Sequence, residues 1–185
     1  PAECGPACLS LCQDVQGETF EYPEEFFKER IHNIRRPRPD DFQIKQAVEK
    51  IKNSKKPIII SGGGVFYSDA MDELGNFAIK HNIPVTQTVM GYSTMKKDHS
   101  HFVGPIGGLG GKAANNLAKE TDLAICIGTK LADFTTGSWA NFENPEFKLV
   151  SINIARHDAN KHLAEAVIGD AKVTLTELSL SLIHI

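Results

Sequence analysis

The sequence of 185 residues is long enough for one sizeable hydrophobic core and part of a second domain. Its 41% hydrophobic content, 23% charged content and formal net charge of -3 are typical of a soluble globular protein and argue against a nucleic-acid partner. No apolar run approaches the roughly 20 residues that span a bilayer, and the first residues lack the pattern of a signal peptide, so we expect a cytoplasmic protein with no membrane partner. Because the chain starts with Pro1, we interpret it as a fragment of a longer protein.

Residues 5–12, "GPACLSLC", have the composition of a buried strand. On such a strand Cys8 and Cys12 share a face but lie about 13 Å apart, at about 3.3 Å per residue. That separation is too large for one tetrahedral metal site. We therefore favour buried or free thiols, including Cys126, over a metal site or a disulfide.

Residues 13–42 read as a linker, because the sequence turns acidic, then basic, then rich in proline. Pro23 followed by two glutamates predicts a short helix, and Phe26, Phe27 and Ile31 are expected to cover a neighbouring surface. The arginines in "RRPRPD" are interpreted as solvated linker charge rather than as a phosphate-binding patch.

Alternating helix and strand patterns begin at Asp40 or Asp41, the predicted N-cap of a helix that extends to about Ser54. Its apolar residues follow the helical spacing: Ile44, Ala47, Val48 and Ile51. The further predicted elements are strands at 57–61, 84–88, 122–128 and 148–153 and helices at 68–82, 112–120 and 170–182. Strands that are apolar throughout and alternate with helices predict an α/β domain, with a doubly wound, mainly parallel sheet covered by helices on both faces.

The first glycine turn, Gly62 to Gly64, follows a strand and precedes a helix, where backbone amides can face a phosphate. The dinucleotide fingerprint fails, however, because Tyr67 stands where a third small residue is required. The next strand ends in Gln87 and Thr88, without the acid that receives a ribose. Both observations argue against classical NAD binding.

The second glycine turn, "GLGGKA" at 108–113, formally fits G-x-G-x-x-A and opens a helix. It is not a phosphate loop of the Walker type, because Ile106 and Ala113 occupy two of the required positions. Kinase-like and GTPase-like chemistry is thereby excluded. For both turns, two interpretations stay open: a corner that only glycine can make, or a contact with a phosphate or nucleotide.

Other candidate residues are isolated. His99, His101, His157 and His162 have no carboxylate or thiol at a metal-ligand spacing and are interpreted as polar loop residues. Ser138 does not stand in a nucleophile elbow. Asp133 follows a strand at its carboxyl end, where it either contacts a ribose or a neighbouring domain or caps its loop.

The ordered series "PIIISGGGV", "PVTQTVMG", "GPIGGLGGKAANNLAKETDLAICIGTKLADFTTGS" and "SINIARHDANKH" resembles the thiamine diphosphate-dependent enzymes, such as acetolactate synthases, over nearly the entire chain. The stretches "QDVQGETFEYPEEFF", "IRRPRPD" and "DFTTGSWANF" are most similar to a branch that hydrolyses a C–C bond to open a cyclic 1,2-diketone of myo-inositol catabolism. The resemblance implies that residues 1–14 are the last strand of an N-terminal pyrimidine-binding domain, 15–42 a linker and 43–182 the middle domain. Residues 183–185 depart from the family pattern, and whether this tail is native is left open.

Enzymes of this family bind thiamine diphosphate and Mg²⁺ between their first and third domains, usually from two subunits. The resemblance therefore implies that missing N- and C-terminal domains of the same polypeptide, in a homodimer or homotetramer, act on a small-molecule substrate. It implies no catalytic residue and no metal ligand in this chain. Some relatives hold FAD or ADP in the middle domain, which makes candidate cofactor-binding residues of Gly62, Gly63, Gly64, Val65, Gly107, Gly108, Gly110, Gly111 and Asp133.

Three functions are thus in competition. The first is a fragment, inactive by itself, of a thiamine diphosphate-dependent C–C bond hydrolase. The second is a fragment of an acetolactate synthase-like carboligase, which differs in its product. The third is a non-catalytic domain for nucleotide binding or oligomer assembly.

Overall fold

The computed structural model describes residues 6–31 and 33–183. The elements before the sheet are α1 (Gln13–Gln16), the 3₁₀ helix η1 (Glu24–Phe27) and α2 (Asp41–Asn53). The strands are β1 (Pro57–Ser61), β2 (Val85–Gln87), β3 (Phe102–Pro105), β4 (Leu123–Ile127), β5 (Lys148–Asn153) and β6 (Glu165–Ile168). The remaining helices are α3 (Gly63–Tyr67), α4 (Met71–His81), η2 (Val89–Gly91), α5 (Lys112–Glu120), α6 (Asp133–Thr136), α7 (Arg156–Ala159), η3 (Lys161–Leu163) and α8 (Ala171–Ile183).

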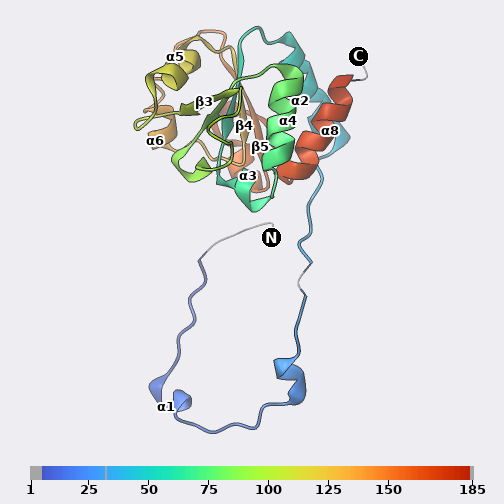
Figure 1. The fold of residues 1–185 in the computed structure, drawn as a ribbon, viewed down its shortest axis with the longest axis vertical. Helices are drawn as coiled ribbons and strands as arrows, with labels where there is room; N and C mark the ends of the chain where they lie inside the picture. The colour runs from blue at the N-terminus through green and yellow to red at the C-terminus, as the bar shows by residue number, and fades with distance from the viewer. Residues whose placement is uncertain (1–5, 32, 184–185) are drawn as a thin grey trace.

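The six strands form one sheet in the order β3-β2-β1-β4-β5-β6, and every neighbouring pair is parallel. From the central pair β1 and β4, the chain winds outward in both directions. In Figure 1, α2, α4 and α8 lie on one side of the sheet, and α5 and α6 lie on the other. The predicted doubly wound, parallel α/β fold is confirmed.

The two hydrophobic clusters of the core follow from the alternation of side chains along each strand. In β1, Ile59 faces the cluster beneath α2, α4 and α8, whereas Ile58 and Ile60 face the cluster beneath α5. Burial on both faces is the reason that the central strands read as continuous apolar runs.

Helix α2 begins where its sequence predicts. The Asp40 carboxylate accepts a hydrogen bond of 2.9 Å from the backbone N of Gln43, as an N-cap does. The buried residues of the helix are those predicted from the helical spacing, Ile44, Ala47, Val48 and Ile51.

The helix predicted at 68–82 is wrong in its first turn. Helix α3 begins inside the glycine run, at Gly63, and α4 begins only at Met71. Asp69 separates the two, with a backbone φ of 53°. The side chain and carbonyl of Ser68 are held by residues distant in sequence, Asp170 and Arg36, which local periodicity does not reveal.

The strand predicted at 5–12 does not form in residues 6–12, which adopt no regular structure before α1. A strand needs a neighbour for its backbone hydrogen bonds, and no strand of this sheet pairs with residues 6–12. The assignment of residues 1–14 to another domain stays a prediction, and residues 1–5 lie outside the described part. Of the predicted tail at 183–185, the structure describes only Ile183, the last residue of α8. Within the described ranges, no helix combines the length and apolar character needed to cross a membrane.

Candidate functional site

The carboxyl edge of the sheet is where an open α/β fold places ligands, outside the strands at which the winding reverses. Here these strands are β1 and β4. The predicted residues all follow strands at this edge: Gly62 to Val65 lead from β1 into α3, Gly107 to Gly111 follow β3, and Asp133 opens α6 after β4. The structure thus brings all three predicted segments to one edge of the domain.

The triple-glycine turn packs directly against the backbone that follows β4. The Gly62 amide donates to the Ile127 carbonyl at 2.8 Å, and the Gly64 amide donates to the Gly128 carbonyl at 2.9 Å. A Cβ on Gly62 would lie 2.4 Å from the Gly128 oxygen, and one on Gly64 would lie 2.6 Å from the Gly128 Cα. The glycines therefore allow two backbones to touch, and two of their amides are not available to a phosphate in this conformation.

The second glycine turn is likewise closed by its own hydrogen bonds. The amide of Gly107 donates to Asn115 Oδ1 at 3.0 Å, and that of Gly108 donates to the Phe134 carbonyl at 2.8 Å. The amides of Gly110 and Gly111 donate to the carbonyls of Gly107 and Pro105, both at 2.8 Å. This loop is tied to α5 and α6, and its amides do not converge on an open space.

Asp133 is exposed at the first position of α6, next to the residue that accepts from Gly108. Its Oδ2 accepts a hydrogen bond of 3.3 Å from Ser138 Oγ, and its backbone carbonyl accepts from the Ser138 amide at 3.2 Å. These contacts hold the turn after α6 in place. The predicted contact between Asp133 and a ribose stays a proposal.

Sequence reasoning missed a hollow beside the glycine turns, at the carboxyl ends of β2 and β3. Its volume is about 710 Å³. Tyr92, Phe102 and Pro105 supply apolar walls, and Lys97 and Gln87 supply polar groups.

Two polar groups of the hollow beside β2 and β3 set its chemistry. Gln87 is 6% exposed, and its Oε1 is buried without a hydrogen-bond partner among the described residues. Lys97 Nζ lies 5.9 Å from the centroid of the Tyr92 ring. The sequence does contain a signal for this hollow, because Gln87 and Thr88 stand at the end of the second predicted strand. We interpreted these two residues only as evidence against NAD binding.

The hollow at the amino edge, of about 570 Å³, is lined by charges of both signs, including Lys55, Lys56 and Asp122. Burial alone raises the pKa of Asp122. Hydrogen bonds from Ser54 Oγ and from the amides of Lys55 and Lys56 together lower it by more, so the net shift of its pKa is downward. This carboxylate holds the start of β1 in place. The hollow lies at the edge opposite to the one where this fold places ligands.

Cys126, His101 and His162 have structural surroundings in this fold. Cys126 is fully buried in β4, and burial raises the pKa of its thiol, which makes it unreactive. His101 Nε2 lies 3.0 Å from Asn82 Oδ1, and the His162 ring packs against Trp139 at 4.6 Å between centroids. In residues 6–31 and 33–183, no three His, Cys, Asp or Glu residues are grouped so that they could hold a metal ion. These described residues therefore offer no ligand set for the Mg²⁺ that the resemblance implies.

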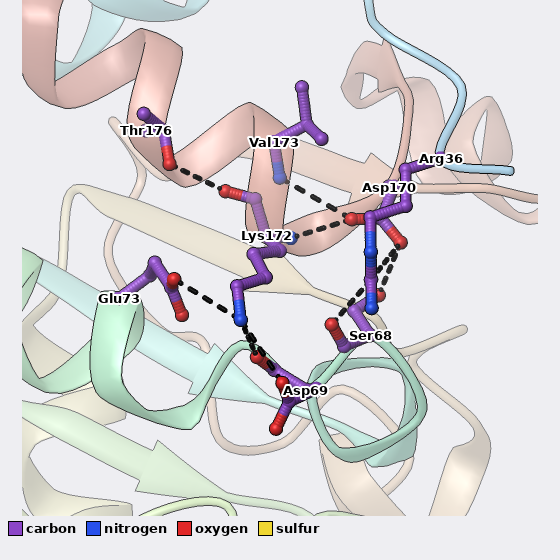
Figure 2. A network of polar contacts seen from close by, with 8 residues as sticks. All are labelled: Arg36, Ser68, Asp69, Glu73, Asp170, Lys172, Val173 and Thr176. Atoms are coloured by element: carbon purple, nitrogen blue, oxygen red, sulfur yellow. Dashed lines mark hydrogen bonds and ion pairs between the residues drawn. The ribbon is translucent and has the colours of Figure 1, made fainter. Parts of the chain in front are cut away.

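Asp170, which immediately precedes α8, has a structural task. Its Oδ1 accepts from the amides of Lys172 and Val173, at the start of α8, at 3.0 and 3.3 Å. Its Oδ2 accepts from Arg36 at 3.0 Å and from Ser68 Oγ at 2.9 Å. Figure 2 shows that Asp170 thereby joins α8, the linker and the end of α3.

The strand order, with its reversal between β1 and β4 and its glycine corners at that reversal, defines a Rossmann-like α/β domain. The chain belongs to the thiamine pyrophosphate enzymes: residues 44–178 match the family described as "Thiamine pyrophosphate enzyme, central domain".

Curated relatives extend the similarity beyond that domain. The chain is 47% identical over 182 residues to the 3D-(3,5/4)-trihydroxycyclohexane-1,2-dione hydrolase of Clostridium perfringens strain 13, a match that covers 98% of this chain and 28% of the relative. It is 48% identical over 178 residues to the protein of the same name from Clostridium botulinum strain Alaska E43, covering 96% of this chain and 28% of the relative. The chain thus spans little more than a quarter of the length of these relatives.

A solved structure shares the fold. An X-ray structure of a Mycobacterium smegmatis protein assigned to the thiamin diphosphate-dependent enzymes matches with a TM-score of 0.65 and 22% identity. The match covers 83% of this chain and 30% of that one.

Proposed function

We propose that this chain is the central domain and preceding linker of a thiamine diphosphate-dependent hydrolase that opens the ring of trihydroxycyclohexane-1,2-dione by cleaving a C–C bond. The observation that carries the proposal is the 47% identity over 98% of the chain to a relative with that named activity. The similarity includes the linker, which precedes the family match at residue 44.

The domain's part in that enzyme is to position other domains. Its glycine amides are used within the fold, and its described residues present no grouped metal ligands. The coenzyme, Mg²⁺ and the reacting carbonyl are therefore assigned to the other domains of the same polypeptide, in a homodimer or homotetramer. By this reasoning the isolated chain has no turnover.

The test is expression of the complete reading frame that contains this chain, followed by an assay of the diketone with thiamine diphosphate and Mg²⁺. Stoichiometric formation of the ring-opened acid supports the proposal. Formation of an acyloin from two 2-oxo acids, without ring opening, would replace it with the carboligase alternative. Turnover by the 185-residue chain alone would overturn the assignment of catalysis to other domains.

A second candidate function is nucleotide binding, and the hollow beside β2 and β3 favours it. Its volume of about 710 Å³ suits a nucleotide-sized ligand, and its apolar walls and buried Gln87 carbonyl suit a planar ring that carries an N–H donor. The glycine turns and Asp133 lie on the same edge of the sheet. We assign FAD or ADP to this edge as the class of ligand to test.

The measurement is the thermal midpoint of the chain with FAD, ADP, NAD or thiamine diphosphate with Mg²⁺. A ligand at 100 times its Kd stabilises by about 2.7 kcal/mol, or roughly 5 to 10 °C at this size. A shift with FAD or ADP that is lost in Gln87→Leu supports the site. If none of the four ligands shifts the midpoint, the nucleotide site is rejected and the glycines are corners only.

A further inference from the structure

The linker has two halves with opposite character. Its second half is fastened to the domain: Arg36 binds Asp170 and the Ser68 carbonyl, Arg38 forms an ion pair with Glu177, and Pro39 is buried. Its first half, up to residue 31, makes no such contact, since residues 13–31 are all exposed. In Figure 1 this blue part of the chain runs away from the domain.

The exposed half carries a cluster of aromatic rings between residues 18 and 31, here called the aromatic segment. Tyr22 lies 5.1 Å from Phe20, 4.8 Å from Phe26 and 6.0 Å from Phe27, measured between ring centroids. The exposed fractions of these four side chains range from 52% to 72%, and Ile31 is 83% exposed. An apolar surface of this kind marks an interaction site when it is continuous and rimmed by polar groups.

The charges around the rings indicate the partner. Between residues 14 and 30 the sequence has six acidic and two basic residues. The complementary surface is therefore apolar at its centre and basic at its rim. Within the described residues, the domain does not cover the aromatic segment, because residues 6–31 are all exposed.

We propose that the aromatic segment docks onto an apolar, basic-rimmed surface of the part of the parent polypeptide that lies outside this chain. This rests on the proposed function, in which the chain is one part of a longer enzyme, and the relatives leave room for it because the chain covers 28% of their length. Arg36 fastens the second half of the linker to the domain, and docking of the rings fixes the first half.

Trypsin tests the proposal, because Lys28 and Arg30 lie within the aromatic segment. We expect cleavage after these residues to be at least about tenfold slower in the parent polypeptide than in the isolated chain, since a docked segment must first open. Mass spectrometry identifies the cleaved bonds. Equal rates in the two proteins would overturn the proposal.

The matched variants are Phe26→Ser/Phe27→Ser and, as a control, Phe42→Ser on the outer side of α2, where Phe42 is 68% exposed. In the parent, the double variant is expected to be cleaved as fast as the isolated chain, and the control as slowly as the unaltered parent. Unchanged thermal midpoints of the isolated variants show that the domain is folded. Protection in both variants would overturn the role of the rings.

The source of the docking surface is tested by light scattering of the isolated chain. A dimer that the double variant abolishes would assign the surface to a second copy and overturn docking within one polypeptide. Diketone hydrolysis is measured separately, so that a protected segment in a parent without hydrolysis rejects the proposed function and retains the docking.

Discussion

Removal of the Asp170 carboxylate should destabilise the domain more than removal of an exposed ion pair would. The side chain of Asp170 is 5% exposed in its ion pair with Arg36, which is 28% exposed. Loss of the helix cap costs about 1 kcal/mol. Loss of a hydrogen bond with a charged partner costs about 1.5 to 3 kcal/mol. Asp170→Ala should therefore lower the free energy of unfolding by about 3 kcal/mol, or roughly 6 to 12 °C in Tm at this length.

Urea denaturation of the isolated chain measures this effect, and Asp69→Asn provides the control. Asp69 also forms an ion pair, with Lys172 at 3.1 Å, but its side chain is 72% exposed, and such pairs contribute about 0 to 1 kcal/mol. A double-mutant cycle of Asp170→Ala with Arg36→Met should give a non-zero coupling energy. A loss below about 1 kcal/mol for Asp170→Ala, or no coupling, would refute the view that this carboxylate fastens the linker to α8.

Three further predictions concern single residues. The folded-state pKa of Asp122 is lowered, so the stability that this carboxylate contributes is present above its unfolded pKa and is lost as pH falls through the folded pKa. Acid should therefore destabilise Asp122→Asn less than it destabilises the unaltered chain. Urea melts from pH 5 downward will check this. Gly64→Ala should lose about 1 to 3 kcal/mol because its Cβ meets Gly128 at 2.6 Å, whereas Gly111→Ala, with its nearest contact at 4.0 Å, should be nearly neutral in the same melts. Cys126 should resist a thiol reagent at pH 8 until the chain unfolds, as mass spectrometry of labelled peptides will report.

Elements with strong local patterns were predictable from the sequence. Helix α2 has both an N-cap and a complete apolar stripe, and β1 matches its predicted bounds because a buried apolar run ends at a glycine turn. Helix α5, at Lys112–Glu120, also matches. In each case the residues that decide the element lie within it or directly beside it.

Edge strands and chain breaks were less predictable because distant residues decide them. Strand β6 has only one fully buried residue in its pattern, Val167, and was missed, since an edge strand lacks the continuous apolar run of a central one. The break between α3 and α4 depends on Arg36 and Asp170, which bind Ser68 from 32 and 102 positions away. Such contacts leave no periodic signal.

The candidate site shows the same division at the level of function. The sequence places glycines after β1 and β3, and the fold brings them to the carboxyl edge of the sheet. The sequence does not say what the glycine amides bind. The partner of these amides depends on how closely the loop after β4 approaches the first glycine turn. The Gly64 amide lies 2.9 Å from the Gly128 carbonyl, so protein backbone takes the place that a phosphate has in a dinucleotide-binding domain. In this conformation the Gly62 and Gly64 amides serve packing, so we expect the proposed ligand at this edge to depend on side chains such as Gln87 more than on these two amides.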